Sequence, residues 1–346
     1  MIILLFLIYC KVTIKNIIYM NKIILILTIV FIISSCKQDD IIIDNVSANN
    51  KYLIFSGNQL IRYTNTNDIE NIINDLPDEV KSVKYFRGYY YVLFKTLQSI
   101  YVISDKKFDI VSKIDFKGSN MLPYDICFPN ATDAYICHSD CNIVTLLDIM
   151  NFQLSNYKIE VAKKPVYIAG IGNQVYVCCQ DDDAIIVIDT RLNEVVDTIN
   201  VASKPRFIDI DVNNEKLFII SKGDDKSSIT FQSFSLQNRE LLNKFNIKNS
   251  EDVIPASIAV SKKYIYITSD CYLWRISAIN EKSAIVVKNK AFIKVKYNPI
   301  YEKFYLLSNS ENLLNSEITI YNANTSKYIS SFNLNIVVDD IIMEYN

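Results

Sequence analysis

The sequence has a single histidine, His138, in 346 residues. A Ser–His–Asp relay needs a histidine beside its nucleophile, and a histidine metal site within one chain needs two or three histidine ligands. The chain also has only six glycines, too few and too dispersed to build a glycine-rich phosphate loop between a strand and a helix. These scarcities argue against a hydrolytic triad, a histidine metal cage and nucleotide chemistry. We therefore expect no metal and no cofactor.

Charge of one sign is also missing. The chain carries 36 basic and 38 acidic side chains, for a formal net charge of −2. Nucleic-acid binding requires a concentrated basic surface, and this balance provides no such field. Half of the residues are hydrophobic and 12% are aromatic, which is typical of a globular protein. We expect a folded domain that has no nucleic acid as its partner.

The first 35 residues have the features of a signal peptide. Asn21-Lys22 provides a short positive segment after Met20, and residues 23–33 are apolar apart from one threonine. Such a stretch is too short to cross a bilayer comfortably. It ends in Ile33-Ser34-Ser35-Cys36, which resembles the lipobox of bacterial lipoproteins and implies lipidation of Cys36 with palmitate as one acyl chain. We expect translation to start at Met20, and an uncleaved membrane anchor is the alternative.

The residues after Cys36 predict where the protein is located. Cys36-Lys37-Gln38-Asp39-Asp40 resembles the surface-export signal of Bacteroidota lipoproteins. This resemblance implies an outer-membrane, cell-surface protein held to the membrane by its lipid anchor alone. We interpret residues 36–50 as the lipidated N-terminus and tether.

A repeat extends along the rest of the chain. An aromatic residue followed by aliphatic positions recurs seven times, and the first and last copies are 253 residues apart, which over six intervals gives about 42 residues per repeat. This period is typical of the four-stranded blades of a β-propeller. The copies are Tyr52-Leu53-Ile54, Tyr91-Val92-Leu93, Tyr135-Ile136-Cys137, Tyr176-Val177-Cys178, Phe218-Ile219-Ile220, Tyr266-Ile267-Thr268 and Tyr305-Leu306-Leu307.

The fourth repeat shows the blade most clearly. Pro165 begins one predicted strand, and three more follow within forty residues, at 175–177, 185–189 and 195–199. Proline is tolerated where a strand begins because its missing N–H is least costly there. Pro123, Pro165, Pro205 and Pro255 accordingly predict the first strands of four successive blades.

This pattern of Pro-x-x-Ile, Val-Tyr-Val, Val-Ile-Asp-Thr and Val-Val-x-x-Ile resembles the repeat of the YVTN (YncE-like) β-propeller family. Residues 165–205 match it closely, and the other repeats match it more loosely. The resemblance implies an all-β fold over residues 51–346, a seven-bladed β-propeller of four-stranded antiparallel blades. The glycine-containing turns usual in the family are replaced here by Asn, Asp, Lys and Ser.

The two ends of the repeat region predict that the ring is closed. Residues 338–343 have the pattern of a first strand, whereas the N-terminal repeat begins directly with the second-strand signal at Tyr52. We expect the C-terminal strand to complete the first blade, which removes exposed sheet edges.

Six cysteines follow Cys36. Cys137 and Cys178 occupy equivalent positions of neighbouring repeats among apolar residues. Buried free cysteine behaves as a small hydrophobe, and this is the reading that we favour. The segment Cys137-His138-Ser139-Asp140-Cys141 leaves a strained disulfide or a metal site as the alternative.

The candidate binding residues lie in loops. The YVTN resemblance implies that the connections between blades and the loops between second and third strands open on one face of the ring, where they form a mixed-charge rim around the channel mouth. Solvated turns that keep the protein soluble are the alternative for any single loop. The candidates are Asp181, Asp182, Asp183, Lys163, Lys164, Lys204, Arg206, Tyr124, His138, Asp140, Asp224 and Asp225.

Two classes of function fit these observations. The favoured one is a non-catalytic, surface-anchored binding or scaffold module for a protein, glycan or small ligand. Such a module could serve as an accessory protein of an outer-membrane transporter. We expect it to be a monomer. The alternative is an extracytoplasmic propeller enzyme of the lyase or lactonase type. Such enzymes usually need several histidines or a metal cage, which the single histidine disfavours.

Overall fold

Alternating apolar residues fold each repeat into a small antiparallel sheet. The computed structural model describes residues 52–64, 68–116, 121–223, 228–248, 254–269, 272–288, 290–310 and 314–343. These residues form twenty-eight β-strands in seven four-stranded sheets. Within them no helix is long and apolar enough to cross a membrane. The signal peptide, the start at Met20, the lipidation of Cys36 and the tether are predictions that lie outside the described residues.

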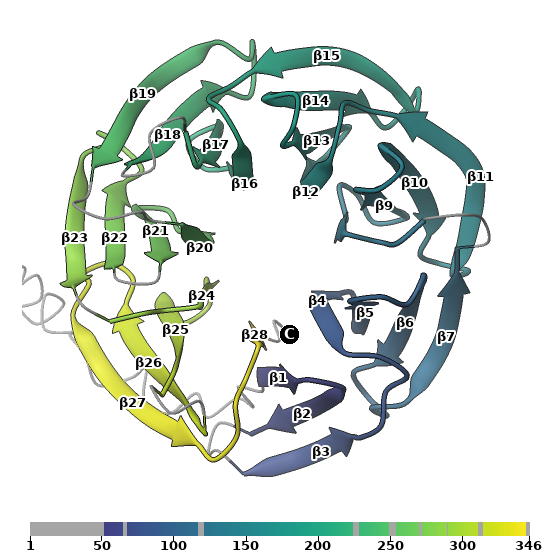
Figure 1. Ribbon diagram of the computed structural model, residues 1–346, viewed down its shortest axis with the longest axis vertical. Helices are drawn as coiled ribbons and strands as arrows, with labels where there is room; N and C mark the ends of the chain where they lie inside the picture. Colours follow the sequence, from purple (N-terminus) through teal and green to yellow (C-terminus); the bar gives the residue numbers. More distant parts are fainter. Residues whose placement is uncertain are drawn as a thin grey trace, which may run out of the picture. The chain divides into compact units, whose positions relative to one another are not determined.

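The seven sheets, here called blades 1 to 7, stand side by side around a central opening (Figure 1). Every blade is antiparallel, and only blade 1 combines strands from both ends of the chain. In blade order the strands are β28 (Asp340–Met343), β1 (Tyr52–Ser56), β2 (Gln59–Tyr63) and β3 (Ile69–Ile73); β4 (Val80–Phe86), β5 (Tyr89–Phe94), β6 (Ser99–Ser104) and β7 (Ile110–Asp115); β8 (Asp125–Cys127), β9 (Asp133–His138), β10 (Ile143–Asp148) and β11 (Gln153–Glu160); β12 (Pro165–Ile171), β13 (Gln174–Cys179), β14 (Ala184–Asp189) and β15 (Glu194–Asn200); β16 (Pro205–Asp211), β17 (Lys216–Ser221), β18 (Ser228–Ser235) and β19 (Leu241–Lys248); β20 (Pro255–Val260), β21 (Tyr264–Ser269), β22 (Tyr272–Ser277) and β23 (Ser283–Lys288); β24 (Lys294–Asn298), β25 (Lys303–Asn309), β26 (Ser316–Asn322) and β27 (Tyr328–Leu334).

The position of a strand within its blade determines its burial. The two middle strands are almost fully buried, as in β13 and β14, whereas the outer strand β15 is mostly exposed. Side chains of adjacent blades pack against each other; Tyr176 and Ile185 of blade 4, for example, share a core with Leu217 of blade 5. Apolar burial between blades is the main force that holds the ring together.

The predicted closure of the ring is confirmed. Strand β28 pairs antiparallel with β1, and Ile341 lies opposite Ile54. The backbone N–H of Gly57 also donates to Oδ2 of Asp339 at 2.9 Å. The closing strand is shorter than expected, because it begins at Asp340 rather than at Val338.

The predicted role of the prolines is confirmed in three blades. Pro165, Pro205 and Pro255 are the first residues of β12, β16 and β20. Pro123 differs, because it lies two residues before β8, which spans only Asp125–Cys127. Blade 3 therefore has the shortest inner strand in the part of the chain that the structure describes.

The ring has two faces, which we name by their loops. The upper face holds the connections between blades and the loops between second and third strands, and the backbone bond from Gln180 N–H to Lys164 C=O joins one loop of each set. The lower face holds the remaining turns. Tyr52 and Met343, at the two ends of the described ring, lie opposite each other at the lower end of blade 1.

Candidate functional site

The predicted charged loops lie together on the upper face and are bonded to each other. Oδ2 of Asp182 accepts from the backbone N–H of Lys163 at 2.7 Å, and Oδ1 of Asp183 accepts from that of Lys204, also at 2.7 Å. Nζ of Lys164 lies 3.5 Å from Oδ1 of Asp181. Asp182 therefore binds the backbone of the connection between blades 3 and 4, and Asp183 binds that of the connection between blades 4 and 5. Asp224 and Asp225, the other predicted acidic pair, fall outside the described residues.

His138 lies in the core and not on a loop. It is the last residue of β9 and has no exposed surface, with Nε2 2.9 Å from Oγ1 of Thr145. Burial lowers the pKa of its imidazole to about 4, so the ring is neutral at pH 7. Asp140, two residues later, is exposed in the upper loop of blade 3.

The cysteine alternatives can be compared directly. Cys137 and Cys178 are fully buried in β9 and β13, as the favoured reading predicted. Cys137 and Cys141 are both free, so they do not form the disulfide considered above. Within the described residues, no group of three or more His, Cys, Asp or Glu side chains is placed to hold a metal ion.

The inner strands bring a second set of charged side chains into the central channel. Of this set, the sequence-based predictions named Lys164 and Arg206, and they also named Tyr124, an uncharged residue of the same lining. Within the described residues, the charged groups that line its cavities or form their ion pairs are Lys81, Lys84, Lys164, Arg206, Lys294, Lys296, Asp125, Asp209 and Asp340.

An ion pair between a half-buried lysine and a buried aspartate joins two neighbouring inner strands. Nζ of Lys84, from β4, lies 3.2 Å from Oδ1 of Asp125 at the start of β8. The other oxygen of Asp125 accepts from the backbone N–H of Ile168 at 3.2 Å. Burial disfavours the charged ammonium group, yet the Asp125 carboxylate outweighs it and holds the pKa of Lys84 above its ordinary value. Lys84 is therefore charged and already paired.

Asp340 has a comparable role where blade 7 meets blade 1. Its Oδ2 lies 3.2 Å from Nζ of Lys296 and 3.7 Å from Nζ of Lys294. Burial acts to raise the pKa of Asp340, but the two ammonium groups keep it below its ordinary value. Burial also lowers the pKa of Lys296, and the nearby Lys294 and Lys84 reinforce this effect.

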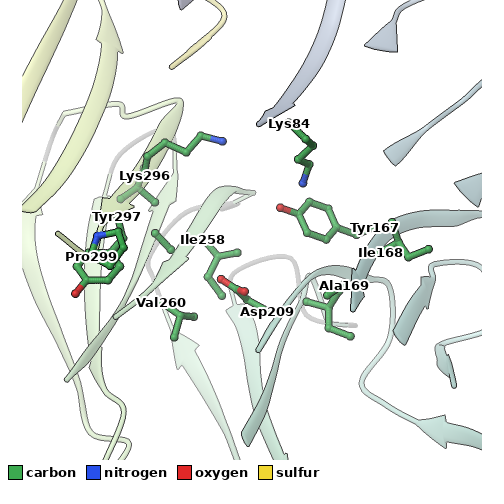
Figure 2. Close-up of a pocket in the computed structure, with 13 residues that line it drawn as sticks. Lys84, Tyr167, Ile168, Ala169, Asp209, Ile258, Val260, Lys296, Tyr297 and Pro299 are labelled. Atoms are coloured by element: carbon green, nitrogen blue, oxygen red, sulfur yellow. The ribbon is translucent and has the colours of Figure 1, made fainter. Parts of the chain in front are cut away.

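Two cavities lie along the channel and share Tyr167 in their walls. The lower chamber has a volume of about 480 Å³ and a largely aliphatic lining that includes Ile258 and Val260 (Figure 2). Figure 2 shows the Tyr167 hydroxyl pointing toward the Lys84 ammonium group, and Asp209 beside Ile258 below Tyr167. The upper chamber, of about 400 Å³, is more polar and is lined by residues of both the channel and the upper loops.

Asp209 is the one channel carboxylate that forms no ion pair in the described part of the chain. Its Oδ1 accepts only from the backbone N–H of Ile210 at 2.8 Å. Burial raises its pKa to about 6, because this bond and the more distant Lys84 do not offset the loss of hydration. Asp209 therefore titrates closer to neutrality than an ordinary aspartate.

The upper chamber combines cations with aromatic rings. Nζ of Lys81 lies 3.0 Å from the ring centroid of Tyr124, and the guanidinium of Arg206 lies 5.9 Å from that of Phe207. Such contacts favour a charged group on an aromatic face. Burial lowers the pKa of Lys81 to about 8. Tyr124 and Arg206, which were expected near the channel mouth, both line this chamber.

Comparisons with known proteins support the β-propeller fold and do not identify a function. No family model matches the chain, and no curated protein matches it. Among solved structures, the β-propeller domain of Cps50 (Swd1) from Myceliophteria thermophila is similar with a TM-score of 0.62 at 11% identity, over 79% of this chain and 99% of that one.

Two other similar structures come from different settings. Hydrazine synthase of Kuenenia stuttgartiensis is similar with a TM-score of 0.59 at 16% identity, over 68% of this chain and 74% of that one. A chain of the mitotic checkpoint complex has a TM-score of 0.62 at 12% identity, over 75% of this chain and 81% of that one. Propellers of this shape therefore occur both in enzymes and in protein complexes, and the fold alone does not separate binding from catalysis.

Proposed function

We propose that this chain is a non-catalytic binding module, a lipid-anchored surface propeller of the YVTN type that captures its partner at the upper face. The observation that carries the proposal is the upper chamber. It joins the channel mouth to the loops, and its lining includes Lys81, Lys164, Arg206 and Tyr124. Polar groups on a rigid scaffold beside aromatic rings are typical of binding sites.

The ends of the described ring leave the upper face open. Tyr52 and Met343 both lie at the lower end of blade 1. The upper face of the described ring therefore carries loops and the channel mouth, and neither of these two residues.

The test is capture of a partner from solubilised outer membranes by the full-length protein. We expect Lys163→Glu, Lys164→Glu and Lys204→Glu, combined in one variant, to weaken capture and leave folding intact. Because the contacts are electrostatic, the loss should appear mainly in the association rate and shrink at high salt. Absence of palmitate labelling in Cys36→Ala checks the anchor separately.

The matched control reverses charge on the other face. Lys262 and Lys263 are exposed in the lower turn between β20 and β21, so Lys262→Glu with Lys263→Glu should capture the partner as the unaltered protein does. If the lower-face variant loses capture and the upper-face variant retains it, the proposed face is wrong. Turnover of a lactone or polysaccharide by the purified protein would contradict the non-catalytic proposal.

A further inference from the structure

The upper chamber holds more positive than negative charge. Four cationic side chains line it, Lys81, Lys164, Arg206 and Lys294, together with one carboxylate, that of Asp125. Both oxygens of this carboxylate are already in use. One pairs with Lys84 at 3.2 Å, and the other accepts from the backbone N–H of Ile168. Asp125 therefore does not balance the charge of the chamber.

Two of the four cations have partners outside the chamber. Lys164 pairs with Asp181 at 3.5 Å, and Lys294 pairs with Asp340 at 3.7 Å. Lys81 and Arg206 have no carboxylate within 4.0 Å in the described part of the chain. Among the described residues, these two positive charges of the chamber therefore have no partner carboxylate.

The surroundings of these two charges are suited to a ligand. Lys81 rests on the ring of Tyr124, and Arg206 lies near Phe207. Ser82, the residue after Lys81, lines the same chamber. The volume of about 400 Å³ is within the range of small-molecule pockets.

We propose that the upper chamber binds a small organic dianion, with one negative charge against Arg206 and the other against Lys81. The planar guanidinium suits the two oxygens of a carboxylate or phosphate, and Lys81 acts as a point charge. This inference rests on the proposed function, because the ligand enters through the upper mouth. Dicarboxylates and phosphomonoesters share the required chemistry, and the experiment separates them.

The test is calorimetric titration of the purified full-length protein with succinate and with glucose 6-phosphate. Succinamide and glucose, which match these probes in shape but lack the charges, are the controls for the ligand. We expect saturable binding of at least one dianion and none of either neutral compound. The compound that binds identifies the chemical class.

Variants then locate the site. Arg206→Gln and Lys81→Met remove one charge each and retain most of the side-chain bulk. Each should raise the Kd about tenfold or more, because a hydrogen bond to a charged group contributes roughly 1.5–3 kcal/mol. Lys263→Met, on the lower face, is the matched control and should leave the Kd unchanged. Failure of both dianions to bind, or unchanged affinity in both chamber variants, would overturn the proposal.

The result also separates this inference from the proposed function. If neither dianion binds but the protein still captures a membrane partner through its upper loops, the inference fails and the binding module stands. If capture also fails or depends on the lower face, the proposed function fails with it.

Discussion

At the scale of single residues, the channel concentrates charges that lie far apart in the sequence. Lys84, Asp125 and Asp209 come from three different blades and meet only because the ring brings their inner strands together. Where opposite charges meet at 3.2 Å, as in Lys84 and Asp125, the carboxylate stabilises the ammonium group. Asp209 has no such partner in the described chain, and burial dominates its titration.

Asp209→Asn is expected to stabilise the protein at pH 7 and to have little effect near pH 4. The pKa of Asp209 is about 6 in the folded state against an ordinary 3.8. Between these values the folded state binds more protons than the unfolded state, so the free energy of unfolding falls as the pH rises through this window. At pH 7 the gain should be about 1–2 kcal/mol, after allowance for water in the channel.

Thermal unfolding at pH 4 and pH 7 measures this difference. Asp115→Asn, on the exposed outer strand β7, is the control and should show no such pH-dependent gain. Equal melting temperatures of Asp209→Asn and the unaltered protein at pH 7 would show that the Asp209 charge is not penalised.

Only part of the chamber lining could be predicted from the sequence. Arg206 and Tyr124 could be expected near the mouth, because each directly follows a proline that marks a blade boundary. Lys81 and Lys294 have no such marker. Whether a channel lysine such as Lys81 or Lys294 has a carboxylate partner depends on distances between side chains of different blades. Spacing along the chain does not reveal these distances. The buried position of His138 could not be predicted either, because strand β9 extends to His138, one residue further than the apolar pattern indicated.

At the scale of elements, the structure accommodates the shortage of glycine in its turns. Fourteen non-glycine residues of the described chain have positive φ. Asn, Asp, Lys and Ser were expected at such positions, and Asn142, Asn193 and Ser326 agree. Phe108 and Phe152 also adopt this conformation, which is costly for a bulky side chain. Strand packing on both sides of these turns therefore outweighs local preference, and composition alone could not identify them.

The turn between β4 and β5 tests this cost. Arg87 and Gly88 have φ of 50° and 82°, the signs required by a two-residue type I′ turn, for which Asn-Gly is preferred. We expect Arg87→Asn to raise the free energy of unfolding by about 0.5–1 kcal/mol, because Asn tolerates the left-handed region better than Arg. Chemical denaturation measures the change.

The neighbouring position provides the opposite substitution. A Cβ on Gly88 would lie 3.4 Å from Oδ1 of Asp105, which is close to an ordinary contact. Gly88→Ala should therefore act mainly through its positive φ and destabilise by about 1–2 kcal/mol. If Arg87→Asn destabilises as much as Gly88→Ala, the turn is not limited by its backbone conformation.

At the scale of the whole molecule, the fold could be predicted because it repeats. Seven copies of one pattern at a period of about 42 residues predicted seven blades, and the unpaired pattern at the C-terminus predicted the closure. Adjacent blades share apolar cores, so we expect the ring to be stable only when it is complete. Strand β28 supplies the last contacts. It pairs with β1 within blade 1, and Asp340 contacts Lys294 and Lys296 of blade 7.

Deletion of residues 337–346 is therefore expected to destabilise all blades together. Ile341, Ile342 and Met343 are buried, and each contributes roughly 1.5–3 kcal/mol through burial. The deletion also uncovers the edge of β1 and breaks the contact between blades 7 and 1. Calorimetry should show one unfolding transition at a much lower temperature, or loss of soluble protein.

The variant Ile341→Ala, which keeps the strand and creates only a cavity, should lower the free energy of unfolding by about 2–5 kcal/mol and still fold. Ile329→Ala on the outer strand β27, where the side chain is 42% exposed, should cost far less. An unchanged melting temperature in both the deletion and Ile341→Ala would mean that the ring does not depend on its closing strand.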